Sequence, residues 1–228
     1  MCGRFNVIDS PQVRTLMEVL GIPFPRSSGL RFSADISPAS PISLVRETAM
    51  GREITDAIWW LMLDPATGKP TRYTSFNSRA DKLHQPRALA YAPYRESRCI
   101  IPASAFVEGF GDGKRYYRIA LQDQAISFGG LYREVLHPET GEVFVGASII
   151  TLGPHPAWRE IHPDSMPLML PLDQPDVLDA WLDPRQQDVR PFEPLLTPTI
   201  RVAQQVTPID RPSKWNPTGD TLLIPAQG

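Results

Sequence analysis

The sequence predicts a mixed α+β fold in which a curved, mainly antiparallel, barrel-like β-sheet core is flanked by short helices. Three observations support this class. The 228 residues include 25 prolines and 15 glycines, which divide the chain into short segments. Most of these segments are apolar and rich in residues that favour strands. With 42% hydrophobic residues the chain can bury a full core, and its length predicts one domain over residues 1–228.

The first expected element is an amphipathic helix near the start of the chain. Ser10 is a suitable N-cap, Pro11 fits the first turn, and Gly21 is a typical stop. Between them the apolar side chains recur at helical spacing: Val13, Leu16, Met17 and Leu20.

Strands are expected to dominate the rest of the chain. The apolar, β-favouring segments cover residues 42–45, 54–63, 117–121, 126–131, 143–152 and 199–206. Shorter helices are expected over residues 84–91, 155–161 and 175–182. In the last of these Pro175 again opens a pattern with its apolar residues on one side.

The charge of the chain bears on whether it is a general nucleic-acid binder. A net charge of -2 argues against a general nucleic-acid binder, because non-specific affinity depends on many phosphate contacts. The basic residues are nonetheless 19 arginines and 4 lysines. Arginine suits phosphate binding, and a bias in genomic base composition would explain the same excess.

The chain shows no sign of membrane insertion or export. No apolar run approaches the roughly 20 residues that span a bilayer, and the start lacks the layout of a signal peptide. We therefore expect a cytoplasmic protein. Cys2 and Cys99 are too few for a disulfide framework, and no cluster of cysteine and histidine is present in the sequence, so we expect neither a metal nor another cofactor.

Cys2 directly follows the initiator methionine. If Met1 is removed, Cys2 carries a free amine beside its thiol, and both titrate near neutral pH, at about 8 and about 8.5. Such a pair can attack an aldehyde as an imine and then close a five-membered thiazolidine, because the second nucleophile is already tethered. Alternatively, the thiol attacks an amide with the α-amine as base, as in N-terminal nucleophile hydrolases. A cysteine without a chemical role is the third interpretation.

Several sequence blocks occur together in a characteristic order. They are MCGRF at residues 1–5, SFNSRAD at 75–81, RCIIPA at 98–103 leading to FVE at 106–108, ISFGGLY at 126–132, and IH at 161–162 followed by MP at 166–167. In this order the blocks resemble the SRAP family, the SOS response-associated peptidases. The resemblance runs from Cys2 to about Leu170 and is weaker beyond it.

This resemblance implies covalent capture of abasic sites in single-stranded DNA as part of the DNA damage response. In the family the N-terminal cysteine closes on the aldehyde of the base-free sugar as a thiazolidine, which shields the lesion. Cys2 matches the nucleophile of the family, Asn77 its motif asparagine, Glu108 the acid that ends its conserved block, and His162 its histidine. The implied partner is single-stranded DNA containing an abasic site, bound in the cytoplasm at the nucleoid by a monomer.

The chemistry of these side chains is compatible with such roles. Glu108 could move protons if burial raises its pKa, and His162 could protonate the sugar oxygen or the imine. Asn77 could orient the amine or a sugar hydroxyl without competing for protons. Taken singly, each residue also has an ordinary explanation: a surface charge, a structural histidine, and a turn or cap.

Three further residues match DNA-contacting positions of the family. Arg4 and Arg79 correspond to arginines that bind phosphates and set the register of the strand. Pro38 corresponds to a proline that helps to separate the strands, although a turn at a strand edge would explain it equally. The blocks WLMLDPA at 60–66, Glu108-Gly109 and HPDSMP at 162–167 depart from the family pattern, which predicts weaker or differently shaped DNA binding.

Two other functions stay open from the sequence. An N-terminal nucleophile amidohydrolase would turn over glutamine or another amide and would fold as a four-layer sandwich with two facing sheets. A non-catalytic DNA-binding module would keep its DNA affinity after Cys2→Ala and would form no denaturant-resistant complex.

Overall fold

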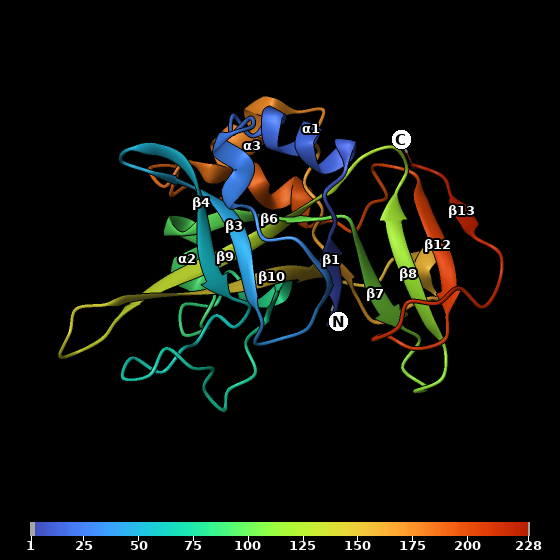
Figure 1. Ribbon diagram of the computed structural model, residues 1–228, viewed down its shortest axis with the longest axis horizontal. Helices are drawn as coiled ribbons and strands as arrows, with labels where there is room; N and C mark the ends of the chain where they lie inside the picture. The colour runs from blue at the N-terminus through green and yellow to red at the C-terminus, as the bar shows by residue number, and fades with distance from the viewer. Residues whose placement is uncertain (1–2, 228) are drawn as a thin grey trace.

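The computed structural model of the chain describes residues 3–227. Five of its strands form a closed barrel, in the order β10-β4-β3-β6-β9 and back to β10 (Figure 1). Every neighbouring pair in this ring is antiparallel except β10 with β4, which is parallel and has the single register pair Gly146 and Ile58. The strands are β3 Pro41–Thr48, β4 Gly51–Ile58, β6 Arg98–Ala103, β9 Ile126–Leu136 and β10 Val143–Leu152.

The parallel seam between β4 and β10 depends on a glycine. A Cβ atom at Gly146 would lie 2.5 Å from the carbonyl oxygen of Trp60. Only a residue without a side chain allows the two backbones to approach this closely. Gly146 therefore permits the barrel to close.

A second, antiparallel sheet lies beside the barrel, in the order β13-β12-β8-β7-β1-β2. Figure 1 shows β1 between the barrel strands and β7, β8, β12 and β13. Two short strands join β10 outside the ring, β5 Asn77–Arg79 in parallel and β11 Met166–Pro167 antiparallel. The sheet consists of β1 Phe5–Val7, β2 Ser33–Ile36, β7 Ala105–Gly109, β8 Tyr116–Leu121, β12 Gln204–Ile209 and β13 Leu222–Ile224.

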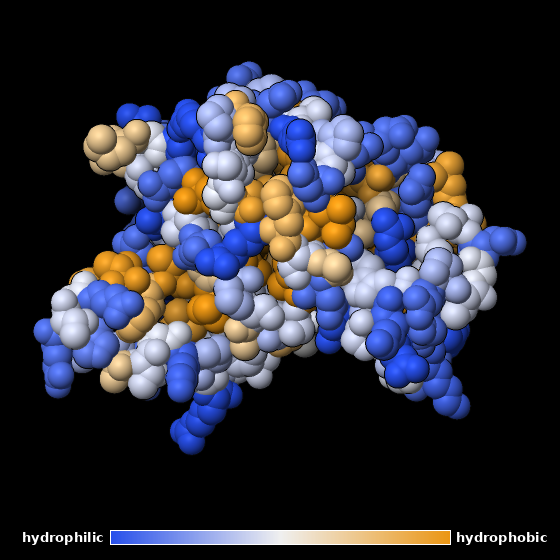
Figure 2. Space-filling model, in the orientation of Figure 1, coloured by the Kyte–Doolittle hydropathy of each residue, from blue (hydrophilic) through white to orange (hydrophobic). Residues whose placement is uncertain are grey.

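The core contains a chain of aromatic rings that links the barrel to the sheet. The ring of Phe5 contacts Trp59 at a centroid distance of 4.8 Å and Phe128 at 6.0 Å. Phe106 then contacts Phe128 at 5.5 Å and Trp158 at 5.9 Å. All five rings are fully buried. Figure 2 shows apolar side chains gathered over the barrel half of the visible face, with hydrophilic ones over much of the rest.

Two of the expected helices are present as predicted. Helix α1, Pro11–Val19, is capped by Ser10, whose hydroxyl accepts a hydrogen bond from the amide of Val13 at 3.3 Å. Helix α3, Pro175–Leu182, buries Leu178, Trp181 and Leu182. In Figure 1 both helices lie on the same side of the barrel. No helix within residues 3–227 is long and apolar enough to cross a membrane.

Other boundaries differ from the sequence prediction. Residues 84–90 form turns and bends, and a helix begins only at Tyr91, where α2 covers Tyr91–Glu96. Pro86 lies in the middle of the expected helix, where it removes a backbone donor, whereas Pro93 lies in the first turn of α2, where proline is tolerated. The segment 155–161 contains only a 3₁₀ turn at Pro156–Trp158. The last expected strand begins at Gln204 instead of residue 199. The remaining 3₁₀ segments are Arg26–Gly29, Ala80–Lys82 and Arg190–Leu196.

A buried arginine joins α2 and α3 to the barrel. Arg98 on β6 is 3% exposed, and its guanidinium donates five hydrogen bonds of 2.7–2.8 Å to backbone carbonyls. These carbonyls belong to the ends of both helices and the loop after α3, where helix dipoles concentrate partial negative charge. Burial lowers the pKa of Arg98 to about 10, so the group stays cationic at neutral pH. The accepting residues are Tyr94, Arg95, Trp181, Asp183 and Gln186.

The architecture confirms the α+β class and the curved, mainly antiparallel, barrel-like core. The sequence prediction did not include the second sheet as a separate layer, because periodicity alone does not assign strands to sheets.

Candidate functional site

Glu108 is a buried carboxylate on β7. Side chains two residues apart on a strand point to the same face, so Glu108 shares the inward face of Phe106. Only 2% of Glu108 is exposed. This burial raises the pKa of Glu108 to about 7. The carboxyl group can therefore both release and accept a proton near neutral pH.

His162 lies next to this carboxyl group in the loop after η3, Pro156–Trp158. The distance from His162 Nδ1 to Glu108 Oε2 is 3.9 Å. Nδ1 donates a hydrogen bond of 2.6 Å to the carbonyl oxygen of Gly109, since a carbonyl can only accept. The other ring nitrogen, Nε2, lies 3.2 Å from the Ser165 hydroxyl. These contacts fix the orientation of the imidazole and its Nδ1 proton.

Burial lowers the pKa of His162 below its ordinary value. The ring is therefore mainly neutral at pH 7, with Nε2 accepting from the Ser165 hydroxyl. Burial thus moves both groups towards their neutral forms, raising the pKa of Glu108 and lowering that of His162, and neighbouring groups with displaced pKa values are typical of functional sites.

The N-terminal segment runs along β7 towards Glu108. Strand β1 pairs antiparallel with β7, and the carbonyl of Arg4 accepts a hydrogen bond of 2.8 Å from the amide of Val107. Because β1 runs antiparallel to β7, Gly3, the first described residue, lies beside Glu108, which follows Val107. The predicted nucleophile Cys2 lies outside the described residues.

Arg4 belongs to a small polar network at the end of β1. Its guanidinium forms an ion pair with Asp35 of β2, and the indole nitrogen of Trp215 donates to the same carboxylate at 3.1 Å. The side chain of Arg4 is 23% exposed. Pro38 lies in the turn that connects β2 to β3, next to Ala39, whose φ is +70°.

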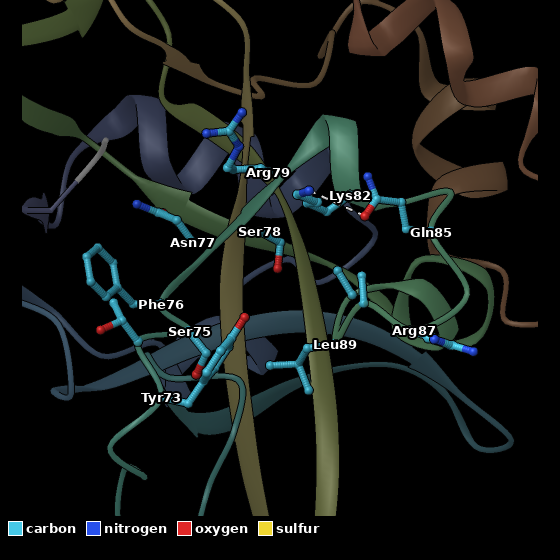
Figure 3. Close-up of a pocket in the computed structure, with 13 residues that line it drawn as sticks. Tyr73, Ser75, Phe76, Asn77, Ser78, Arg79, Lys82, Gln85, Arg87 and Leu89 are labelled. Carbon is cyan, nitrogen blue, oxygen red and sulfur yellow. Dashed lines mark hydrogen bonds between the residues drawn. The ribbon is translucent and has the colours of Figure 1, made fainter.

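Asn77 and Arg79 come from strand β5. The pairing of β5 with β10 aligns Asn77 with Ile149 and Arg79 with Thr151. Ser78, between them, is buried and bonded to Ser148 at 2.7 Å between the hydroxyl oxygens. Figure 3 shows the Asn77 side chain on the opposite side of β5 from that of Ser78. Arg79 is exposed and pairs with Asp81 through two hydrogen bonds of 2.9 and 3.0 Å.

Two neighbouring cavities, which share Arg79, link the Asn77 side chain to the surroundings of His162. Arg79 lines a pocket of about 530 Å³ together with Asn77, and it also lines a cavity of about 230 Å³ together with Ser165. Ser165 is the hydrogen-bonding neighbour of His162. The structure therefore brings Glu108 and His162 into one cluster, and places Asn77 and Arg79 along a surface that leads to that cluster through Ser165.

Residues 1–212 match the sequence family described as SOS response associated peptidase (SRAP). The chain belongs to the SRAP family. No curated protein matches this SRAP-family chain.

Solved structures show the same fold. A protein from Bordetella bronchiseptica is 21% identical with a TM-score of 0.62 and covers 86% of this chain and 94% of its own. A protein from Bacteroides thetaiotaomicron is 20% identical with a TM-score of 0.67, at 90% and 92% coverage. A phage-related protein from Bordetella bronchiseptica is 18% identical with a TM-score of 0.62, at 95% and 99% coverage.

Sequence reasoning missed two neighbours of the predicted site residues. Ser165 lies three positions after His162 in the block HPDSMP, and this short separation in the sequence could have indicated that the two side chains are in contact. Asp35 lies 31 residues from its partner Arg4, and no local signal indicated the pairing.

Proposed function

We propose that this SRAP-family chain captures abasic sites in single-stranded DNA by a covalent bond to Cys2, and so protects the lesion during the DNA damage response. The observation that carries the proposal is Glu108, buried, with its pKa raised to about 7, and 3.9 Å from His162. Few structural reasons favour a buried carboxyl group at this position. It lies where the N-terminal segment begins, so a proton carrier adjoins the segment that bears the nucleophile.

The reaction begins after hydrolysis of the Met1–Cys2 peptide bond, either by the protein itself or by an aminopeptidase. The sugar ring of the abasic site opens to an aldehyde. The Cys2 amine adds to the aldehyde carbon, and loss of one water gives an imine. The Cys2 thiol then adds to the imine carbon, and its proton passes to nitrogen. One water is lost overall, no oxidant is needed, and no metal or cofactor takes part.

Glu108 and His162 would move the protons in these steps. Glu108 accepts a proton from the Cys2 α-ammonium group, which leaves the free amine that attacks the aldehyde, and returns the proton to the departing water. His162, held by Gly109 and Ser165, has a neutral Nε2 that can take up a proton from the sugar side and give it back. Such proton transfers typically contribute about 10²- to 10⁴-fold to the rate.

The DNA strand would follow the surface from Asn77 to Arg4. Arg79 exchanges its exposed pair with Asp81 for a phosphate at little cost, because exposed ion pairs contribute only about 0–1 kcal/mol. Arg4 supplies a second phosphate contact and Pro38 separates the strand from its neighbour. Asn77 orients the sugar or the amine. We propose that the protein acts as a monomer in the cytoplasm, at DNA.

The amidohydrolase alternative is less well supported. It requires a four-layer sandwich with two facing sheets, whereas residues 3–227 form a closed barrel beside one antiparallel sheet.

The test is an intact-mass and denaturing-gel assay with a single-stranded oligonucleotide that carries one abasic site. The expected product is protein without Met1 plus the oligonucleotide minus one water. Cys2→Ala keeps the amine, so it should yield an adduct only after borohydride reduction of the imine. Cys99→Ala is the matched control, because Cys99 is buried and burial raises the pKa of its thiol, and it should react like wild type. An adduct of Cys2→Ala that survives denaturation without reduction would overturn the mechanism.

A further inference from the structure

The pocket that Asn77 and Arg79 line carries positive charge. Its lining includes the cations Arg79, Lys82 and Arg87 and no carboxylate. The whole chain has a net charge of -2, so this concentration of cations is a local feature. At about 530 Å³ the pocket has the size of a small-molecule site.

The same pocket has an aromatic and aliphatic wall. Tyr73 is 59% exposed, so its ring is accessible to a ligand in the pocket. In Figure 3 the ring of Tyr73 and the side chain of Leu89 lie near each other, while Lys82 and Arg87 lie towards another side of the pocket. Leu89 and Phe76 also pack against the core, which fixes this wall.

Hydrogen bonds hold the cationic rim in place. Lys82 Nζ donates to Gln85 Oε1 at 3.4 Å, and Gln85 Nε2 donates to the carbonyl oxygen of Asp81 at 3.0 Å. Asp81 also holds Arg79. The rim is therefore partly organised before any ligand arrives, which reduces the entropy cost of binding.

We infer that this pocket takes one unpaired nucleotide of the strand that carries the abasic site. The base packs between Tyr73 and Leu89, and the adjoining phosphates contact Lys82 and Arg87. Stacking on an aromatic side chain is tolerant of sequence, because every base has a π-face, and cations beside it track the backbone. The inference rests on the proposed function, since Asn77 of the proposed site lines the same pocket.

The first test uses an undamaged, dye-labelled oligothymidine, so that it needs no crosslink. Tyr73→Ala should weaken binding about 5- to 160-fold, the range for loss of one stacked base, while Tyr73→Phe should bind like wild type. The matched control is Phe24→Ala, because Phe24 is 75% exposed and does not line the pocket.

The second test measures the salt dependence of the same binding. The double variant Lys82→Ala/Arg87→Ala should reduce the slope of log K against log salt concentration by about 1.4, since each phosphate contact to a single strand contributes about 0.7. Lys114→Ala, in an exposed loop outside the pocket, should leave the slope unchanged.

A third test places 5-iododeoxyuridine next to the lesion and maps the photocrosslinked peptide, which should contain Tyr73. If Tyr73→Ala, the double variant and the photocrosslink all resemble the controls while the abasic adduct still forms, the pocket inference is wrong and the proposed function stands. If undamaged strands depend on Tyr73 but no adduct forms, the pocket binds DNA and the proposed chemistry is wrong. Binding of free thymidine monophosphate as tight as that of the oligonucleotide would show a nucleotide site and would overturn the assignment to a strand.

Discussion

Arg98 and Glu108 are both ionisable groups buried to within 3% of full burial, and burial disfavours the charged form of each, yet only Arg98 stays charged across the physiological range. Arg98 has five carbonyl acceptors at 2.7–2.8 Å, and its pKa of about 10 keeps it charged throughout the physiological range. Glu108 has a pKa of about 7, so its charge changes within that range. Both groups lie in the same continuous interior.

The difference separates a structural charge from a chemical one. The Arg98 guanidinium, whose donors are taken up by backbone carbonyls, stays charged at neutral pH and joins α2 and α3 to the barrel. A buried carboxyl group whose pKa is moved to neutrality destabilises the fold when it ionises, and such a group is typical of an active site.

Replacing Glu108 by Gln should have the largest effect. The amide keeps the shape but exchanges no proton, so the rate of adduct formation should fall about 10²- to 10⁴-fold. Single-turnover denaturing gels measure this rate. The exposed Glu160→Gln is the control. A wild-type rate for Glu108→Gln would make Glu108 a structural residue like Arg98.

Replacing Arg98 by Met should lower the free energy of unfolding by at least about 3 kcal/mol, because five buried carbonyls lose a charged donor. Arg98→Lys should recover only part of this loss, since an ammonium group has three donors and lacks the planar fork. Urea unfolding measures both. Full stability of Arg98→Lys would contradict the role assigned to the five bonds.

The stability of the wild type should also depend on pH through Glu108. Its pKa is about 7 in the folded state and 4.5 as the ordinary value. The folded protein therefore keeps this proton after the unfolded chain has lost it. The contribution is fully present below pH 4.5 and is lost as pH rises through 7, a difference of about 3 kcal/mol.

Glu108→Gln lacks this dependence and should gain stability relative to wild type between pH 4.5 and 8. His162 acts in the opposite direction, because its lowered pKa reduces stability as pH falls below 6.5. Subtracting the two urea-derived profiles isolates the part of the pH dependence that requires the Glu108 carboxyl group. A difference that stays flat with pH would show that Glu108 titrates normally.

The smallest effect is expected for Ser165→Ala. Loss of the 3.2 Å contact with Nε2 should cost about 1 kcal/mol of stability. Because the hydroxyl favours the neutral imidazole, the pKa of His162 should rise towards its ordinary value. NMR titration of the imidazole protons, assigned with His162→Gln, measures the shift. An unchanged pKa would mean that burial alone sets it.

Local signals predicted local structure well. Ser10 and Pro175 marked the starts of α1 and α3, because capping and proline effects depend on neighbouring residues. The closure of the barrel depends on Gly146 and Ile58, 88 residues apart, and no periodicity indicates such a pairing. The prediction of a helix over residues 84–91 was wrong because it did not take account of Pro86, which disfavours a helix at that position.

The candidate site shows the same limit. The strands expected from the sequence did not include β7, so the burial of Glu108 entered the prediction only as a condition for its proton-transfer role. Its proximity to His162 joins residues 54 positions apart and was available only through the family resemblance. The roles of the site residues stay predictions, and the assays above decide them.

The junction between β4 and β10 at Gly146 also affects how easily the barrel can open. The hairpins β3–β4 and β9–β10 each fold from neighbouring residues, with eight and seven register pairs, while one pair joins them across the seam. A single register pair, Val45 with Ile100, likewise joins β3 to β6, so the barrel has two weakly paired junctions, and these are the places where it should open most easily. Strand β5 pairs with β10 beginning at Ile149, three residues after Gly146 of the β4–β10 junction. Opening at the β4–β10 junction would thus move Asn77, on the strand paired with β10, relative to Glu108, which lies on β7 in the other sheet.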